Sequence, residues 1–229
     1  GTITNDLNCV QDDDPIVWKN SYPAIFIQNY SNLTLENMKV VPVGDVRYTM
    51  SNNCGNTVIG GSEISAADGR IAFDVCGFST YTDGVSVTVR NSTINGNVEL
   101  SRSGNNTENV GLNLESGSIT GELKIDPSID LKSVAATTTI TKSASFTGLA
   151  EAPSGYEWTE SGMLQLSDKY AARIGAKYYE TLEDAVKNAV DGNTIVLLKD
   201  SFGNGIKVEA NKFATGLTID FNTHTYTFN

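Results

Sequence analysis

Segment 70–83, a candidate loop insertion, contains several groups that could bind a ligand, and insertions in repeat folds usually carry function. It combines a guanidinium group and carboxylates with aromatic rings. Sugar sites use such mixtures, because the C–H face of a pyranose packs on a ring while its hydroxyl groups need polar partners. We therefore expect a glycan site in this segment. Its candidate residues are Arg70, Asp74, Phe78, Tyr81 and Asp83.

A second aromatic pair, Tyr156 and Trp158, lies in a segment rich in Pro and Gly. The same argument makes this pair a candidate for glycan contact. The alternative, which applies to all these aromatic residues, is that their rings are buried as anchors of loops.

The run Asp12, Asp13 and Asp14 could contribute to a calcium site, since calcium prefers carboxylate oxygens. Three adjacent carboxylates in extended chain cannot all point the same way, so other ligands would be needed. The alternative is a solvated loop that ends at Pro15. No other cofactor is expected.

Cys54 and Cys76 are 22 residues apart, which is close to the repeat described below (76 − 54 = 22). They could form a disulfide across adjacent turns, or remain two free thiols that pack as small hydrophobic side chains. Zinc is disfavoured, because the thiols are scattered and His224 is the only histidine.

The composition favours strands and turns and excludes some partners. Only 19% of the 229 residues are charged, and the formal net charge is −11. An acidic chain does not suit nucleic-acid backbones. No apolar run approaches the roughly 20 residues of a membrane-spanning helix.

The elements that must position these candidates repeat along the chain. The stretch 85–101 and the stretch 110–126 place apolar residues and one glycine at equivalent points, with an offset of 25 (110 − 85 = 25). Looser copies make Leu35, Ile59, Val89 and Leu114 equivalent, and 142–148 resembles 115–121 at an offset of 27 (142 − 115 = 27). Asn, Ser or Gly stands between the two apolar runs of each copy, which is typical of a tight corner.

Alternating short strands that recur every 20 to 30 residues indicate an all-β solenoid. A parallel β-helix needs only inward apolar residues stacked turn on turn, and it tolerates variable spacing. The Leu/Asn consensus of a leucine-rich repeat is absent, which disfavours that type of solenoid. An antiparallel sandwich is the remaining alternative, although hairpin signals are sparse.

From residue 152 the pattern changes. Residues 182–190 have helical periodicity, Thr181 with Asp184 resembles a capping box, and Gly192 occupies the place of a C-terminal glycine. Strands are expected again at 194–198, 206–209 and 217–228. We therefore divide the chain into a β-helix (1–151), a linker with a strand pair (152–169) and a helix-capped start of a second β-helix-like module (170–229), which is either truncated or packed on the first.

The segment "AARIGAKYYETLEDAVKNAVDGNTIVLLKD", followed by "LTIDFNTHTYT", resembles a module of large secreted or surface-anchored bacterial proteins. In those proteins it opens a right-handed parallel β-helix of the pectate-lyase-like superfamily. The resemblance implies an extracellular or cell-surface location and roles in adhesion or carbohydrate binding.

Enzymes of that fold carry motifs that this chain lacks. The Asn-Thr-Asp, Gly-His-Gly and Arg-x-Lys motifs of galacturonan hydrolases are absent, and adjacent aspartates occur only in the run from Asp12 to Asp14. The expected function is therefore a non-enzymatic surface module, monomeric, whose partner is a glycan or a host surface protein. The alternative is a polysaccharide lyase or glycoside hydrolase.

Overall fold

The computed structural model describes residues 1–4, 25–43, 46–78, 80–103, 108–127, 129 and 138–229. It separates into two compact units. Unit 1 contains residues 1–153 and 158–165, and unit 2 contains residues 154–157 and 166–229.

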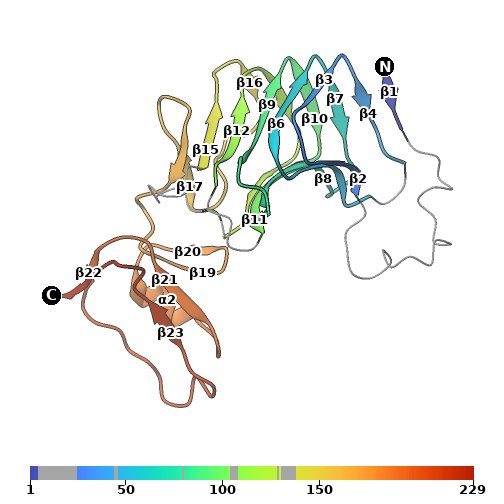
Figure 1. Cartoon of the computed structure of the whole chain (residues 1–229). Helices are drawn as coiled ribbons and strands as arrows, with labels where there is room; N and C mark the ends of the chain where they lie inside the picture. Colours follow the sequence, from blue (N-terminus) through green and yellow to red (C-terminus); the bar gives the residue numbers. More distant parts are fainter. Residues whose placement is uncertain (5–24, 44–45, 79, 104–107, 128, 130–137) are drawn as a thin grey trace, which may run out of the picture. The chain divides into compact units, whose positions relative to one another are not determined.

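Unit 1 is a parallel β-helix, as the repeat predicts (Figure 1). The chain visits three sheets in turn, and every strand pairs in parallel with the equivalent strand of the next turn. Sheet A consists of β1 (Thr2–Ile3), β4 (Lys39–Val40), β7 (Glu63–Ser65), β10 (Ser92–Asn95), β13 (Gly117–Ile119) and β16 (Phe146–Thr147). Sheet B consists of β2 (Ile25–Asn29), β5 (Tyr48–Asn52), β8 (Ile71–Phe78), β11 (Asn97–Ser103) and β14 (Leu123–Ile125). Sheet C consists of β3 (Leu33–Glu36), β6 (Gly55–Gly60), β9 (Val85–Arg90), β12 (Val110–Leu114) and β15 (Thr138–Lys142).

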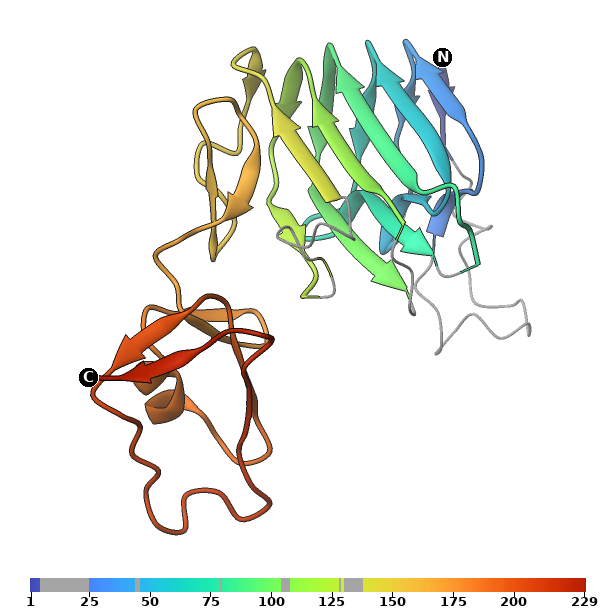
Figure 2. The same ribbon diagram turned by 60° about the vertical axis from the view of Figure 1, so that its left-hand side comes forward.

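The register confirms the predicted equivalences. Leu35 pairs with Ile59, Ile59 with Val89, and Val89 with Leu114. All four side chains are buried in the interior of the solenoid. Figure 2 shows the strands of consecutive turns lying side by side in this stack.

The corners between sheets C and A use the residues that the repeat marks. Asn37, Gly61 and Asn91 all have a positive φ, near 50°. Glycine adopts this conformation freely, and asparagine tolerates it because its amide bonds locally. The predicted corner residues are therefore confirmed at these three turns.

The last turn departs from the predicted offset of 27. Lys142 pairs with Leu114, an offset of 28 (142 − 114 = 28), and Phe146 pairs with Gly117, an offset of 29 (146 − 117 = 29). The predicted offset was wrong at both strands, and the step from 28 to 29 arises because the corner between β15 and β16 holds one more residue than the corner between β12 and β13.

Unit 2 begins with the hairpin of β19 (Ala172–Ile174) and β20 (Lys177–Tyr179), followed by α2 (Leu182–Asn188). The short helix confirms the amphipathic segment, and Thr181 caps it by accepting a hydrogen bond from the Asp184 N–H at 3.0 Å. The helix ends at Asn188, so Gly192 is not its C-terminal glycine. Gly192 lies instead in the turn that Asn193 closes by bonding Val190.

After α2 the chain again pairs in parallel. Strand β21 (Thr194–Leu197) pairs with β23 (Thr218–Asp220), and β22 (Ser201–Gly203) pairs with β24 (Tyr226–Phe228). The expected strand at 206–209 is wrong, because that segment has no neighbouring strand and leaves Ile206 and Val208 exposed. The core of unit 2 packs the buried face of α2 against β19 and β21. A two-stranded sheet of β17 (Tyr156–Trp158) and β18 (Leu164–Leu166) precedes this core in the chain.

Candidate functional site

The outward side chains of sheet B form a polar surface of unit 1, and we call this surface the sheet B face. Strands alternate their side chains between two sides. Phe73 and Val75 are fully buried in the interior, so Asp74 between them points outward. The register places Gln28, Ser51, Asp74, Glu99 and Lys124 in one row across the five strands.

Asp74 is the unusual member of this row, because its side chain points outward yet the residue is only 6% exposed. Its Oδ1 accepts a hydrogen bond from the Asn52 N–H at 2.8 Å, and its Oδ2 accepts one from the Ser51 hydroxyl at 3.1 Å. Burial raises the pKa of Asp74 to about 7, the two hydrogen bonds oppose that increase, and the charge of Glu99 adds to it.

Tyr48 reaches across the same face. Its hydroxyl donates to Glu99 Oε2 at 2.8 Å. Strand β8 lies between β5 and β11, so the Tyr48 side chain must cross β8 to reach Glu99. Burial and this bond to Glu99 raise the pKa of Tyr48. Asp74 and Glu99 are thus neighbouring carboxyl groups on adjacent strands, and Tyr48 bonds the second of them.

A small charged pocket lies at the end of the sheet B face where its strands begin. Its volume is about 140 Å³, and its charged lining residues are Arg47, Arg70, Glu99 and Lys124. The Arg47 guanidinium also lies 5.4 Å from the centre of the Tyr48 ring. Three cationic side chains around one carboxylate make this pocket locally basic, although the whole chain has a net charge of −11.

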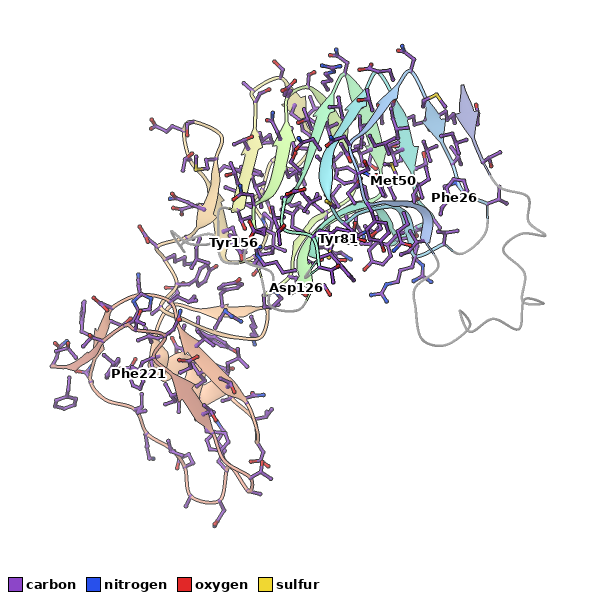
Figure 3. The ribbon with its side chains drawn as sticks, viewed as in Figure 1. Phe26, Met50, Tyr81, Asp126, Tyr156 and Phe221 are labelled. Carbon is purple, nitrogen blue, oxygen red and sulfur yellow. The ribbon has the colours of Figure 1, made fainter. Side chains whose placement is uncertain are left out.

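An aromatic cluster lies toward the other end of the same face. The centre of the Tyr30 ring is 6.4 Å from that of Phe78 and 5.2 Å from that of Tyr81, and the Phe78 and Tyr81 rings are 6.0 Å apart. Tyr30 is 39% exposed. Figure 3 labels Tyr81 at this surface. Phe78 follows Asp74 by four residues, which corresponds to about 13 Å along a strand.

The structure thus brings together only part of the predicted set. Phe78 and Tyr81 join one cluster, Asp74 lies buried in the same face, and Arg70 lines the charged pocket. Asp83 does not belong to this face, because it borders a separate notch on sheet C.

The aromatic pair of the linker has its own neighbours. In unit 2 the Tyr156 ring lies 5.9 Å from that of Tyr178, and the two hydroxyl groups are 3.3 Å apart. In unit 1 Lys142 Nζ lies 5.2 Å from the centre of the Trp158 ring. Both aromatic side chains are half-buried, as expected for anchoring residues.

The remaining candidates are the predicted calcium site and the two cysteines. Asp12, Asp13 and Asp14 lie outside the part of the chain that the structure describes. Within it, no group of three or more His, Cys, Asp or Glu side chains is arranged to hold a metal ion. Cys54 and Cys76 are both free thiols, and burial raises the pKa of Cys76.

The sequence argument missed Tyr48, Glu99 and Lys124. The repeat could have found two of them, because the offset of 25 leads from Asp74 to Glu99 (99 − 74 = 25) and from Glu99 to Lys124 (124 − 99 = 25). No comparable signal marks Tyr48, whose role depends on reaching past the neighbouring strand.

Comparisons of the chain with protein-family models, with curated proteins and with solved structures find no match. Among the described residues, no helix has the length and apolar character needed to cross a membrane. The functional assignment therefore depends on the chemistry of the sheet B face.

Proposed function

We propose that this chain is a glycan-binding β-helix module, whose sheet B face binds an acidic oligosaccharide without cleaving it. The observation that carries this proposal is the presence of an aromatic cluster and a basic pocket on one face. The proposal also places the chain at a bacterial cell surface or outside the cell, as an adhesion module related to the pectate-lyase-like superfamily. That part is supported by the resemblance of segment 171–200.

Each end of the face suits a different part of the ligand. The partly exposed ring of Tyr30, with Tyr81 beside it, offers an apolar surface for the C–H face of a pyranose. The guanidinium groups of Arg47 and Arg70 suit a sugar carboxylate, which they can bind with paired hydrogen bonds. The spacing of the two ends then requires an oligosaccharide rather than a single sugar.

A glycan array tests this proposal. The intact chain is applied to neutral, carboxylated and sulfated oligosaccharides, and the bound glycans are then assayed for new reducing ends and for unsaturated products. We expect binding to carboxylated glycans and no product. Binding of neutral glycans alone, or of none, would contradict the proposal.

Tyr81→Ala sharpens the same test. Loss of the ring should weaken binding by about 1–2 kcal/mol, the usual contribution of an aromatic contact. Tyr178→Ala is the matched control, because Tyr178 belongs to the aromatic contacts of unit 2. Equal loss in both variants would show that the sheet B face is not the binding surface.

The paired carboxyl groups favour glycoside hydrolysis as a second candidate function. Asp74 and Glu99 occupy adjacent paired strands, whose spacing of about 4.8 Å approaches the carboxyl separation of retaining glycosidases. A carboxyl group whose pKa is about 7 could serve as a general acid. Against this function, Asp74 is covered and both of its oxygens accept hydrogen bonds within the sheet. Product formation that Glu99→Gln abolishes would establish the hydrolase.

A further inference from the structure

We propose a second binding site, on the outward surface of sheet C, for a neutral sugar residue. The site is a notch of about 300 Å³ whose lining includes Ser86, Gly111 and Thr139. This volume lies at the small end of the range for ligand pockets. The notch shares no lining residue with the charged pocket of the sheet B face, so the proposal does not depend on the function proposed above.

The notch exists because one side chain is missing from a regular row. The register of β6, β9, β12 and β15 aligns Asn56, Ser86, Gly111 and Thr139 on the outside of sheet C. Each member of this row except Gly111 projects a polar side chain. The absent side chain leaves a hollow between Ser86 and Thr139.

Two loop residues form the walls of the hollow. Asp83 comes shortly before β9, and Asn109 comes directly before β12. Both are exposed. The backbone fixes their neighbourhood, since the Val85 N–H donates to the Asn109 carbonyl at 2.9 Å.

The lining chemistry selects hydroxyl groups. The Ser86 hydroxyl donates to Asn56 Oδ1 at 2.7 Å, which leaves the NH₂ group of Asn56 as a donor. Asp83 supplies an acceptor for two hydroxyl groups, and Thr139 and Asn109 can both donate and accept. Neighbouring hydroxyl groups of a pyranose match such a mixture.

The same lining excludes other ligands. Among the described residues the lining contains no Lys, Arg or His, so it supplies no cationic partner to a carboxylate, sulfate or phosphate. Its single carboxylate is a poor basis for a calcium site, which takes six to eight oxygens and usually several charges. It contains no aromatic ring, so we expect weak affinity, in the millimolar range.

The test is a titration of the ¹⁵N-labelled chain with maltose, lactose and chitobiose, and separately with galacturonate dimer. At least one neutral disaccharide should shift the backbone amides of Ser86 and Gly111 in a saturable way, and the galacturonate dimer should leave them unchanged. Absence of any saturable shift at these amides would overturn the proposal.

Two variants and a control complete the experiment. Gly111→Ser fills the hollow and should lower the affinity at least about tenfold. Gly111 does not have a positive φ, so the variant should fold. Asp83→Asn, at an exposed loop position, should weaken binding independently. Thr88→Ala, on the outside of the same strand β9 but outside the notch, should bind normally. Unchanged binding by both Gly111→Ser and Asp83→Asn would place the sugar elsewhere and contradict the proposal.

Discussion

At the scale of the residue, Asp74 shows how a solenoid can bury a carboxyl group on its outer surface. The outward row supplies Ser51 and Glu99 on either side, and the Tyr48 hydroxyl bonds Glu99 from the far side of β8. Because water is excluded, the neutral acid is favoured, and the charge of Glu99 works in the same direction. Asp74 is therefore a structural element of the face, held beneath the residues that a glycan would touch.

This burial predicts a pH dependence of stability. The pKa of Asp74 rises from 3.8 to about 7 on folding, so the folded state holds the proton more tightly. Stability should therefore fall as the pH increases from about 4 to about 7, while the unfolded state ionises and the folded state does not.

Asp74→Asn removes the titrating group and keeps an oxygen that can accept the Asn52 N–H. At pH 8 the free energy of unfolding of the variant should exceed that of the wild type by about 1.4 kcal/mol or more, which corresponds to a pKa shift of one unit. Thermal melts of both proteins between pH 4.5 and 8 measure this difference. Parallel pH profiles would show that Asp74 is not protonated in the folded state near neutrality.

From the sequence alone, candidate residues can be grouped where they lie close together in one segment, but not where a side chain crosses strands. Phe78 and Tyr81 were found because they lie close together in one segment. Glu99 and Lys124 were missed because they lie one and two turns further along the chain than Asp74. Only a comparison of outward positions at the repeat offset of 25 would have linked Glu99 and Lys124 to Asp74.

At the scale of the element, stacking explains the repeated glycine. A Cβ atom on Gly121 would lie 2.3 Å from the carbonyl oxygen of Gly96, one turn earlier. The two turns can approach only because this side chain is absent. The glycine at the repeat offset is thus a requirement of packing.

This packing requirement applies to Gly121 but not to Gly111. Gly121→Ala should destabilise the fold by about 2 kcal/mol, because the obstacle is rigid backbone. Gly111→Ala should cost less, under about 1 kcal/mol, because its Cβ would meet the Ser86 Cβ at 3.2 Å, a tight contact that a small shift of this side chain relieves. Urea denaturation of the two variants measures both values, and equal costs would refute the stacking argument.

The register of the strands was predictable from the apolar alternation, since a shift by one residue would expose the whole inward row. The exceptions have local causes. An extra residue in the corner after Lys142 shifts the pairing of β16, and the apolar alternation at 206–209 has no neighbouring strand. Neither the extra corner residue nor the missing neighbouring strand can be detected in the short-range periodicity of the sequence.

At the scale of the whole molecule, the two units have separate cores. The core of unit 2 is formed by α2 and the strands around it, and Ala185 is fully buried there. Separate cores should unfold in separate transitions, and the smaller one should be the less stable.

Ala185→Asp tests this independence, because it buries an unpaired charge in unit 2. Scanning calorimetry should show the loss of one transition while the other keeps its midpoint. Lys187→Ala, at an exposed position of the same helix, is the control and should keep both transitions. Loss of all cooperative unfolding in Ala185→Asp would show that the chain folds as one unit.

The central claim is that the sheet B face binds an acidic glycan through its basic pocket. Calorimetric titration with an oligogalacturonate tests it most directly, using Arg47→Ala and the control Arg90→Ala. Arg90 is an exposed arginine on sheet C that pairs with Glu36. The account predicts that Arg47→Ala weakens binding at least about tenfold and that Arg90→Ala changes it less than about twofold. Equal affinity of the two variants, or no binding by the wild type, would contradict the account.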